Sequence, residues 1–180
     1  MSSAYLLLAL ADVPGARIFY DPDLITFQIT GPSVDTVIML MTPVLMLGML
    51  AIAVIGAVKA WRGASFVALF PPLALALVLG FIVLNKVGSP QYMTWLIAPV
   101  VVGLAIDRHR WLRPAVLTVL ILALTQWLFP FAYDWLLVLW PAAVLLVVLR
   151  NVMLLALFAW VVVRLVRLPA RQPVRLRVSE

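Results

Sequence analysis

Apolar residues fill most of the chain in five long runs, which are separated by short stretches rich in charged residues, proline and glycine. An α-helix needs roughly 20 apolar residues to cross the hydrocarbon core of a bilayer. The pattern therefore predicts spanning helices at 34–58, 66–84, 90–106, 114–129 and 141–163. A backbone in lipid must satisfy its own hydrogen bonds, so the expected fold is an all-α membrane bundle of about five transmembrane helices.

The N-terminal segment differs from the five runs. Its apolar stretch, 4–11, is too short to span a bilayer, and aspartate, proline and glycine follow it. The chain thus divides into an extracytoplasmic or interfacial segment at 1–33, a transmembrane bundle at 34–163 and a basic tail at 164–180. Ser33 and Ser89 stand where they can cap the first and third spans, and Pro90 suits a first helical position.

Composition agrees with this division. The 180 residues are 66% hydrophobic and 11% charged, with a mean hydropathy of +1.17, so the chain carries more apolar surface than a soluble domain can bury. The net charge of +6 is spread in short clusters between apolar runs, which argues against nucleic acid as a partner. Without cysteine, and with His109 expected in a basic loop, the sequence indicates no metal site and no cofactor.

The basic clusters predict the orientation. They follow alternate spans: Lys59 and Arg62; Arg108, Arg110 and Arg113; Arg164, Arg167, Arg171, Arg175 and Arg177. Loops rich in lysine and arginine stay in the cytoplasm, so the N-terminus is expected outside and the C-terminus inside. The loop that carries Lys86 then faces outside.

A polar stretch at 85–92 (NKVGSPQY) interrupts the apolar pattern between the second and third spans. Lys86 brings a full positive charge to the start of the next helix, where free backbone N–H groups add a partial one. The simplest ligand for such a site is an anion such as a phosphate. The alternative is a plain connecting loop with one snorkelling lysine.

Arg150 lies about ten residues into the last span, beside Asn151. An arginine at such depth is costly, and it usually faces a partner or a wet cavity. It would bind a substrate anion or pair with an acid, for which Asp134 and Asp35 are the nearest candidates. The alternative is that the helix tilts and Arg150 snorkels to the interface.

Four stretches together resemble a known family. They are 85–92 followed by Trp95-Leu96, then 27–33 (FQITGPS), 125–134 (TQWLFPFAYD) and Arg150-Asn151. Their order and spacing are similar to those of the actinobacterial polyprenol-phosphate-mannose-dependent mannosyltransferases, membrane glycosyltransferases of the GT-C class (family 87). The resemblance runs from about residue 27 to about residue 164.

The resemblance implies a function and a site. A polyprenyl-phosphate sugar donor would enter from membrane lipid, and a sugar, mannose by this likeness, would pass to an extracytoplasmic acceptor. Five residues match positions expected to bind the lipid phosphate: Lys86, Ser89, Gln91, Tyr92 and Arg150. The location implied is a bacterial inner (plasma) membrane, with the site on its outer side.

The family's catalytic acid lies in a first outer loop that nothing here matches, so the catalytic residue is unknown. The chain is expected to be the C-terminal part of such an enzyme and inactive alone, and a second chain could supply the missing N-terminal half. The alternative is a non-enzymatic membrane protein, a lipid carrier or assembly subunit on the same scaffold.

The orientation is testable with reporter fusions at Gly63, Val87, His109 and Glu180. The positive-inside rule predicts that these read inside, outside, inside and inside. A cytoplasmic signal at Val87 would reverse the orientation and remove the argument for an outward-facing anion site.

Overall fold

The computed structural model describes residues 2–23, 26–86 and 88–169. Within them the chain is almost entirely helical, and four helices are long and apolar enough to cross a membrane. These are α2 (Val34–Trp61), α3 (Phe66–Leu84), α5 (Arg108–Gln126) with the π-helical turn η2 (Trp127–Phe131), and α7 (Pro141–Val166). The prediction of a helical membrane bundle is confirmed.

The third predicted span is shorter than the others and has two parts. It begins as a 3₁₀ helix, η1 (Pro90–Leu96), and continues as α4 (Ile97–Ile106). Pro90 occupies the first turn as expected, but the Ser89 side chain makes no capping hydrogen bond. Ser33 likewise makes none, because its backbone is left-handed at φ 59°. Both serines thus occupy the N-cap positions, as expected, but neither side chain caps its helix.

Helix α5 begins well before its predicted start at Pro114. The carboxylate of Asp107 accepts a hydrogen bond from the Arg110 backbone N–H at 3.1 Å and caps the helix there. Arginine is a good helix former, so the cap extends the helix through the basic stretch. His109 accordingly lies in a helix and not in the basic loop that the sequence predicted.

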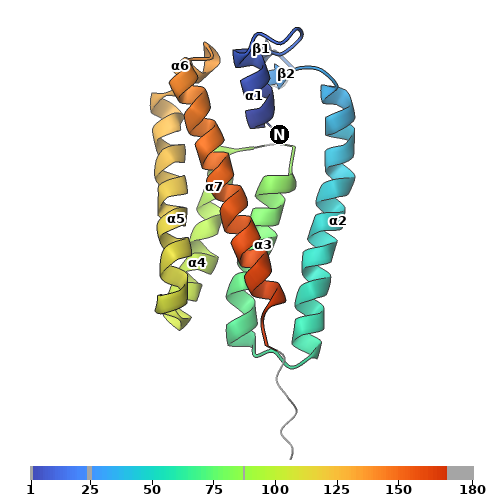
Figure 1. Ribbon diagram of the computed structural model, residues 1–180, viewed down its shortest axis with the longest axis vertical. Helices are drawn as coiled ribbons and strands as arrows, with labels where there is room; N and C mark the ends of the chain where they lie inside the picture. The colour runs from blue at the N-terminus through green and yellow to red at the C-terminus, as the bar shows by residue number, and fades with distance from the viewer. Residues whose placement is uncertain (1, 24–25, 87, 170–180) are drawn as a thin grey trace, which may run out of the picture.

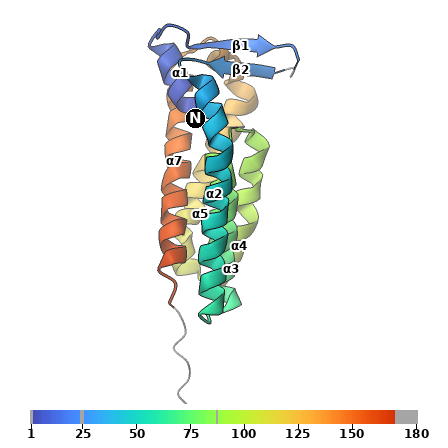
Figure 2. The same cartoon turned by 90° about the vertical axis from the view of Figure 1, so that its right-hand side faces the viewer.

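The N-terminal segment forms a small cover at one end of the bundle. It contains α1 (Ser2–Leu10) and an antiparallel hairpin of β1 (Arg17–Asp21) and β2 (Thr26–Thr30), in which Ile18 is paired with Ile29. The hairpin lies across the end of the bundle (Figure 2). The Tyr5 hydroxyl donates to the carbonyl of Pro32 at 3.1 Å, which ties α1 to the segment entering α2. A lone two-stranded hairpin is marginal in water, so packing on the helices must hold it.

The bundle has two hydrophobic cores. The larger surrounds α3, which lies between α2, α7 and α4, and its centre includes the fully buried Leu75, Ala76 and Leu79. The smaller lies under the hairpin and joins Leu6 of α1 to Val147 of α7. Helix α7 contributes to both cores, and the short helix α6 (Tyr133–Leu137) leads into it.

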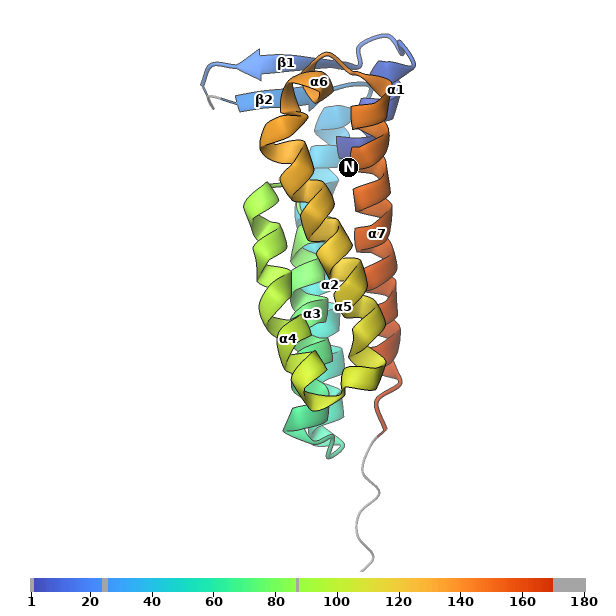
Figure 3. The same cartoon turned by 90° about the vertical axis from the view of Figure 1, so that its left-hand side faces the viewer.

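Helix α3 stops short of the covered end. It has 19 residues against 26 in α7, and seven missing residues correspond to about 10 Å at 1.5 Å per residue. Figure 1 shows α1 and the hairpin above the end of α3, and Figure 3 shows that α4 also begins below the start of α7. The loop after α3, which carries Lys86, therefore lies within the length of the bundle and beneath the cover.

The opposite end of the bundle holds the described basic residues used to predict orientation. Helices α2 and α7 end there and α5 begins there (Figure 1). The Lys59 ammonium donates to the carbonyl of Val166 and, at 2.8 Å, to that of Leu168, so it neutralises the C-terminus of α7. The arrangement agrees with the alternation of loops read from the sequence.

Gly103 provides a stability test of the packing between α4 and α5. A methyl group there would overlap the rigid indole of Trp111, which is 2% exposed. Gly103→Ala should therefore destabilise the bundle by about 1–3 kcal/mol despite the better helix propensity of alanine. The measurement is the free energy of unfolding in detergent.

Gly80→Ala is the matched control. A methyl group there would lie 2.9 Å from the Cδ1 of Ile52, the flexible end of a side chain that can move. If Gly103→Ala leaves the free energy of unfolding unchanged, the indole of Trp111 does not pack closely against α4 at Gly103.

Candidate functional site

Arg150 interrupts the buried stripe of α7. The buried positions of this helix include Val144 and Val147, which precede Arg150 in the sequence, and Leu154 and Leu157, which follow it. The first pair belongs to the core under the hairpin and the second pair to the core around α3. Because the spacing is three or four residues throughout, Arg150 lies on the same inward face and separates the two cores.

The buried guanidinium of Arg150 has one polar partner among the described residues. Its Nε and Nη2 donate to the Oδ1 of the adjacent Asn151 at 3.2 and 2.9 Å. Arg150 is only 9% exposed, yet no carboxylate of the described chain lies within 4.0 Å of it. Neither Asp134 nor Asp35 neutralises it, and its side chain stays buried within the bundle. The structure thus favours the cavity-facing interpretation over snorkelling.

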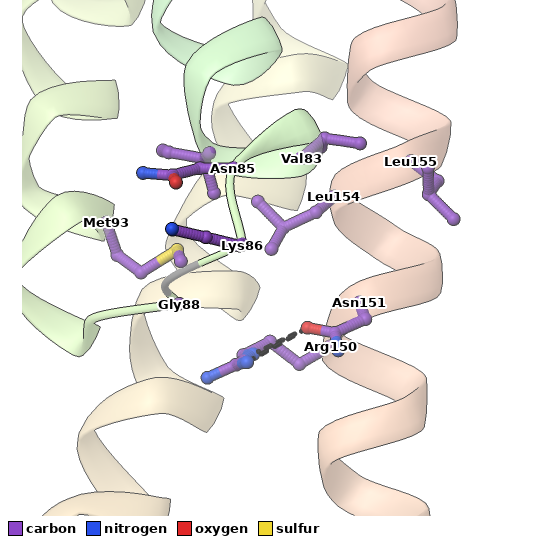
Figure 4. A pocket seen from close by; sticks show the side chains of 10 residues that line it. Val83, Asn85, Lys86, Gly88, Met93, Arg150, Asn151, Leu154 and Leu155 are labelled. Atoms are coloured by element: carbon purple, nitrogen blue, oxygen red, sulfur yellow. Dashed lines mark hydrogen bonds between the residues drawn. The ribbon is translucent and has the colours of Figure 1, made fainter. Parts of the chain in front are cut away.

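A cavity of about 120 Å³ joins Arg150 to Lys86. Its polar lining comes from the loop after α3 and from α7: Asn85, Lys86, Arg150 and Asn151. Figure 4 shows the side chains of Lys86 and Arg150 extending in a similar direction from the loop and from α7, with the loop at Gly88 between them. A water molecule takes about 30 Å³, so the cavity has room for a few waters or for a small oxyanion in their place.

A second cavity of about 350 Å³ lies on the hairpin side of Arg150. Arg150 and Gly88 line both cavities, and Ser89 lines the second. The cover contributes Gln28, whose amide donates to Asp21. Arg150 therefore stands between a small polar cavity and a larger one roofed by α1, the hairpin and α6.

Tyr133 of α6 brings a hydroxyl to the second cavity. Burial, and next the charge of Asp134, raise the pKa of its phenol above the ordinary value. The phenol is therefore neutral at neutral pH and able to donate a hydrogen bond. Aromatic rings of Phe27 and Phe129 lie close to Tyr133, with the Phe129 ring centroid at 4.9 Å.

The structure brings together three of the five residues predicted to bind phosphate. Lys86, Ser89 and Arg150 line the two cavities, whereas Gln91 and Tyr92 do not. Gln91 lines a separate cavity with Thr94 and Gln126, and the Tyr92 ring packs on Phe81 and Trp95. A 3₁₀ helix turns by about 120° per residue, so η1 directs these two side chains away from the loop.

Sequence reasoning assigned no role to Asn85, Gln28 or Met93, which also line the cavities. Asn85 adjoins Lys86 in the polar stretch, so its position carried a signal. Gln28 lies in the stretch 27–33 that is part of the resemblance, but no binding role was expected for it because the hairpin was not predicted. Within the described ranges, no group of three or more histidine, cysteine or acidic residues could hold a metal ion, and no carboxylate lines either cavity.

The class defined by these features is a helical membrane protein with a covered, cationic cavity. Comparison of the chain with family models, with curated proteins and with solved structures finds no match in any of the three.

The burial of Arg150 predicts an effect on stability. Arg150→Met should raise the melting temperature in detergent, because methionine fills the stripe of α7 and removes a desolvated charge that has no carboxylate partner. Leu154→Met on the same stripe is the control and should give no increase. A marked loss of stability in Arg150→Met alone would instead make Arg150 part of the scaffold.

Proposed function

We propose that the cavities around Arg150 bind the phosphate of a polyprenyl-phosphate sugar donor. The chain would serve as the C-terminal membrane portion of a GT-C type glycosyltransferase that moves mannose to an extracytoplasmic acceptor. The observation that carries the proposal is the convergence of Lys86 and Arg150, from distant parts of the sequence, on one cavity.

The charges in the cavities select an anion. Two cations and no carboxylate line them within the described chain, so an anion is the ligand that would compensate the buried charge of Arg150 and also meet the exposed ammonium of Lys86. Lysine acts as a movable point charge, and arginine offers a planar fork that matches two oxygens of a phosphate. A leaving lipid phosphate develops charge that such groups stabilise when they are already in position.

The surroundings favour a lipid as the bearer of that anion. The smaller cavity is lined by Leu154, which is buried, and by Leu155, which is 52% exposed on the bundle surface. In a bilayer that surface faces lipid, so a polar headgroup could enter the cavity while its chain stays in the hydrocarbon. The basic loops lie at the opposite end of the bundle, so the positive-inside rule assigns the cavities to the outer half of the membrane.

The proposed role is binding and stabilisation of the leaving group, not proton abstraction. A glycosyl transfer needs a carboxylate to activate the acceptor hydroxyl, and none lines the cavities in the described ranges. A further part of the enzyme or a second chain would supply it. The family-level assignment rests on the four resembling stretches, two of which contribute to this cavity: the start of 85–92 (Asn85, Lys86 and Gly88) and Arg150-Asn151.

The lack of a lining carboxylate also favours a second candidate, a lipid carrier or assembly subunit. The genomic sequence immediately upstream distinguishes the two. An in-frame run of further spans with an aspartate in an outer loop supports the transferase, and an unrelated sequence supports the carrier.

Lys86→Ala should weaken binding of a polyprenyl phosphate by about 1–3 kcal/mol, the range for losing a hydrogen bond to a charged group. Lys86→Arg should recover part of the loss, and Arg150→Lys should recover little relative to Arg150→Ala, because one ammonium cannot replace a bidentate contact. The measurement is binding of the lipid phosphate to the detergent-solubilised chain.

Arg113→Ala is the control, since Arg113 is exposed at the far end of the bundle. If Lys86→Ala and Arg150→Ala both bind as the parent does, the cavity is not a phosphate site. If the chain alone transfers sugar from the lipid donor, the proposal that it binds the donor without catalysing the transfer is wrong.

A further inference from the structure

A second cationic cavity lies at the opposite end of the bundle, where α7 ends and α5 begins. It has a volume of about 350 Å³ and is lined by Arg110, Trp160, Val163, Arg164, Arg167, Leu168 and Pro169. Arg110 belongs to the first turn of α5, and the others belong to the last turns of α7 and the residues after it. Three guanidinium groups therefore share one cavity far from Lys86 and Arg150.

Arg164 is held in place without using its hydrogen-bond donors. Its guanidinium carbon lies 5.6 Å from the ring centroids of both Trp111 and Trp160, so the two indoles position the group by cation–π contact. Its Nη2 is 3.9 Å from the Asp107 carboxylate, an ion pair too long for a hydrogen bond. Its Nε is buried and has no partner in the described structure. The guanidinium is thus fixed in place while its buried Nε–H lacks an acceptor.

The charges in this cavity do not balance within the described chain. Asp107 is the single carboxylate that pairs with its arginines, at 3.5 Å from Arg110 and 3.9 Å from Arg164. The guanidinium of Arg167 makes no hydrogen bond or ion pair with any described residue. Three positive charges therefore face one negative charge, and an anion would restore the balance.

The usual intramolecular partners of these arginines are already occupied. Arginine near a helix C-terminus often bonds to the last free carbonyls of the helix. Here Lys59 of α2 donates to the carbonyls of Val166 and Leu168 and takes that role. Capping of α7 therefore does not account for Arg164 and Arg167 at the cavity.

We propose that this cavity binds the phosphate of an anionic membrane phospholipid. A phosphodiester presents two oxygens that accept paired N–H donors from guanidinium groups, and basic pockets at the cytoplasmic ends of spanning helices are suited to such headgroups. Val163 and Val166 are about half exposed beside the cavity and offer an apolar surface to acyl chains. The site is separate from the proposed polyprenyl-phosphate site and does not depend on it.

The test measures binding of phosphatidylglycerol to the full chain by native mass spectrometry from detergent, with phosphatidylcholine as the zwitterionic reference. The double variant Arg110→Gln, Arg167→Gln should raise the dissociation constant for phosphatidylglycerol by about tenfold or more, since each cation near a headgroup contributes. Arg164 is left unchanged because its packing against two indoles also serves the fold.

The matched control is Arg108→Gln with Arg113→Gln. These two residues are exposed, belong to the same helix as Arg110 and do not line the cavity. Their replacement removes the same net charge as the test variant. The control should change the dissociation constant by no more than about twofold, because Arg108 and Arg113 lie outside the cavity and their exposed charges are screened from a headgroup bound there. Equal losses in both double variants, or no loss in either, would overturn the proposal.

Inorganic phosphate provides the second arm. At the same concentration as the lipid it should leave bound phosphatidylglycerol in place, because it lacks the acyl chains that contact the helix surface. Displacement at that concentration would identify a soluble phosphate ligand and overturn the assignment to a lipid.

Discussion

The charge of Arg150 is the constraint on which the covered half of the molecule depends. A guanidinium within a membrane bundle loses water at a cost of several kcal/mol, and no carboxylate of the described chain offsets it. The fold leaves room for polar contact on both sides of the group. Because α3 ends early and η1 begins as a 3₁₀ helix, the loop between them lies within the bundle and brings Lys86 to one cavity. The second cavity lies between the same loop and the hairpin cover, so Arg150 separates two cores that would otherwise be continuous.

The cations at the two ends of the bundle have different surroundings. At the covered end, Arg150 and Lys86 face space that only solvent or a ligand can fill. At the far end, each described cation has structural contacts or exposure to reduce its cost: Lys59 binds the C-terminal carbonyls of α7, and Arg164 packs against two indoles near Asp107. Even there the charges do not balance. Both imbalances are positive, which is the reason we propose a phosphate-bearing lipid as the ligand at each end.

Binding and catalysis are separable in this structure. The groups that we propose to stabilise a leaving phosphate, Lys86 and Arg150, are held by a loop at the end of a buried helix and by α7. Groups that would activate an acceptor are not among the lining residues of the described chain. Such a separation agrees with a role as the donor-binding part of a larger glycosyltransferase. It agrees equally with a carrier that binds a lipid phosphate without changing it chemically.

The sequence alone determined the membrane class and most of the helices, since long apolar runs bounded by proline and charge have no other stable state in lipid. The predicted spans 66–84 and 141–163 match α3 and most of α7. It did not reveal the hairpin, whose strands are too short for a clear alternation, or the helical turns before Pro114, which depend on the cap at Asp107. Within the site, residue type identified Lys86 and Arg150, but only the tertiary structure decided that they share a cavity and that Gln91 and Tyr92 do not. Which side chains line the cavity depends on the residue at which α3 ends and on the directions in which η1 presents its side chains. Tertiary packing determines both.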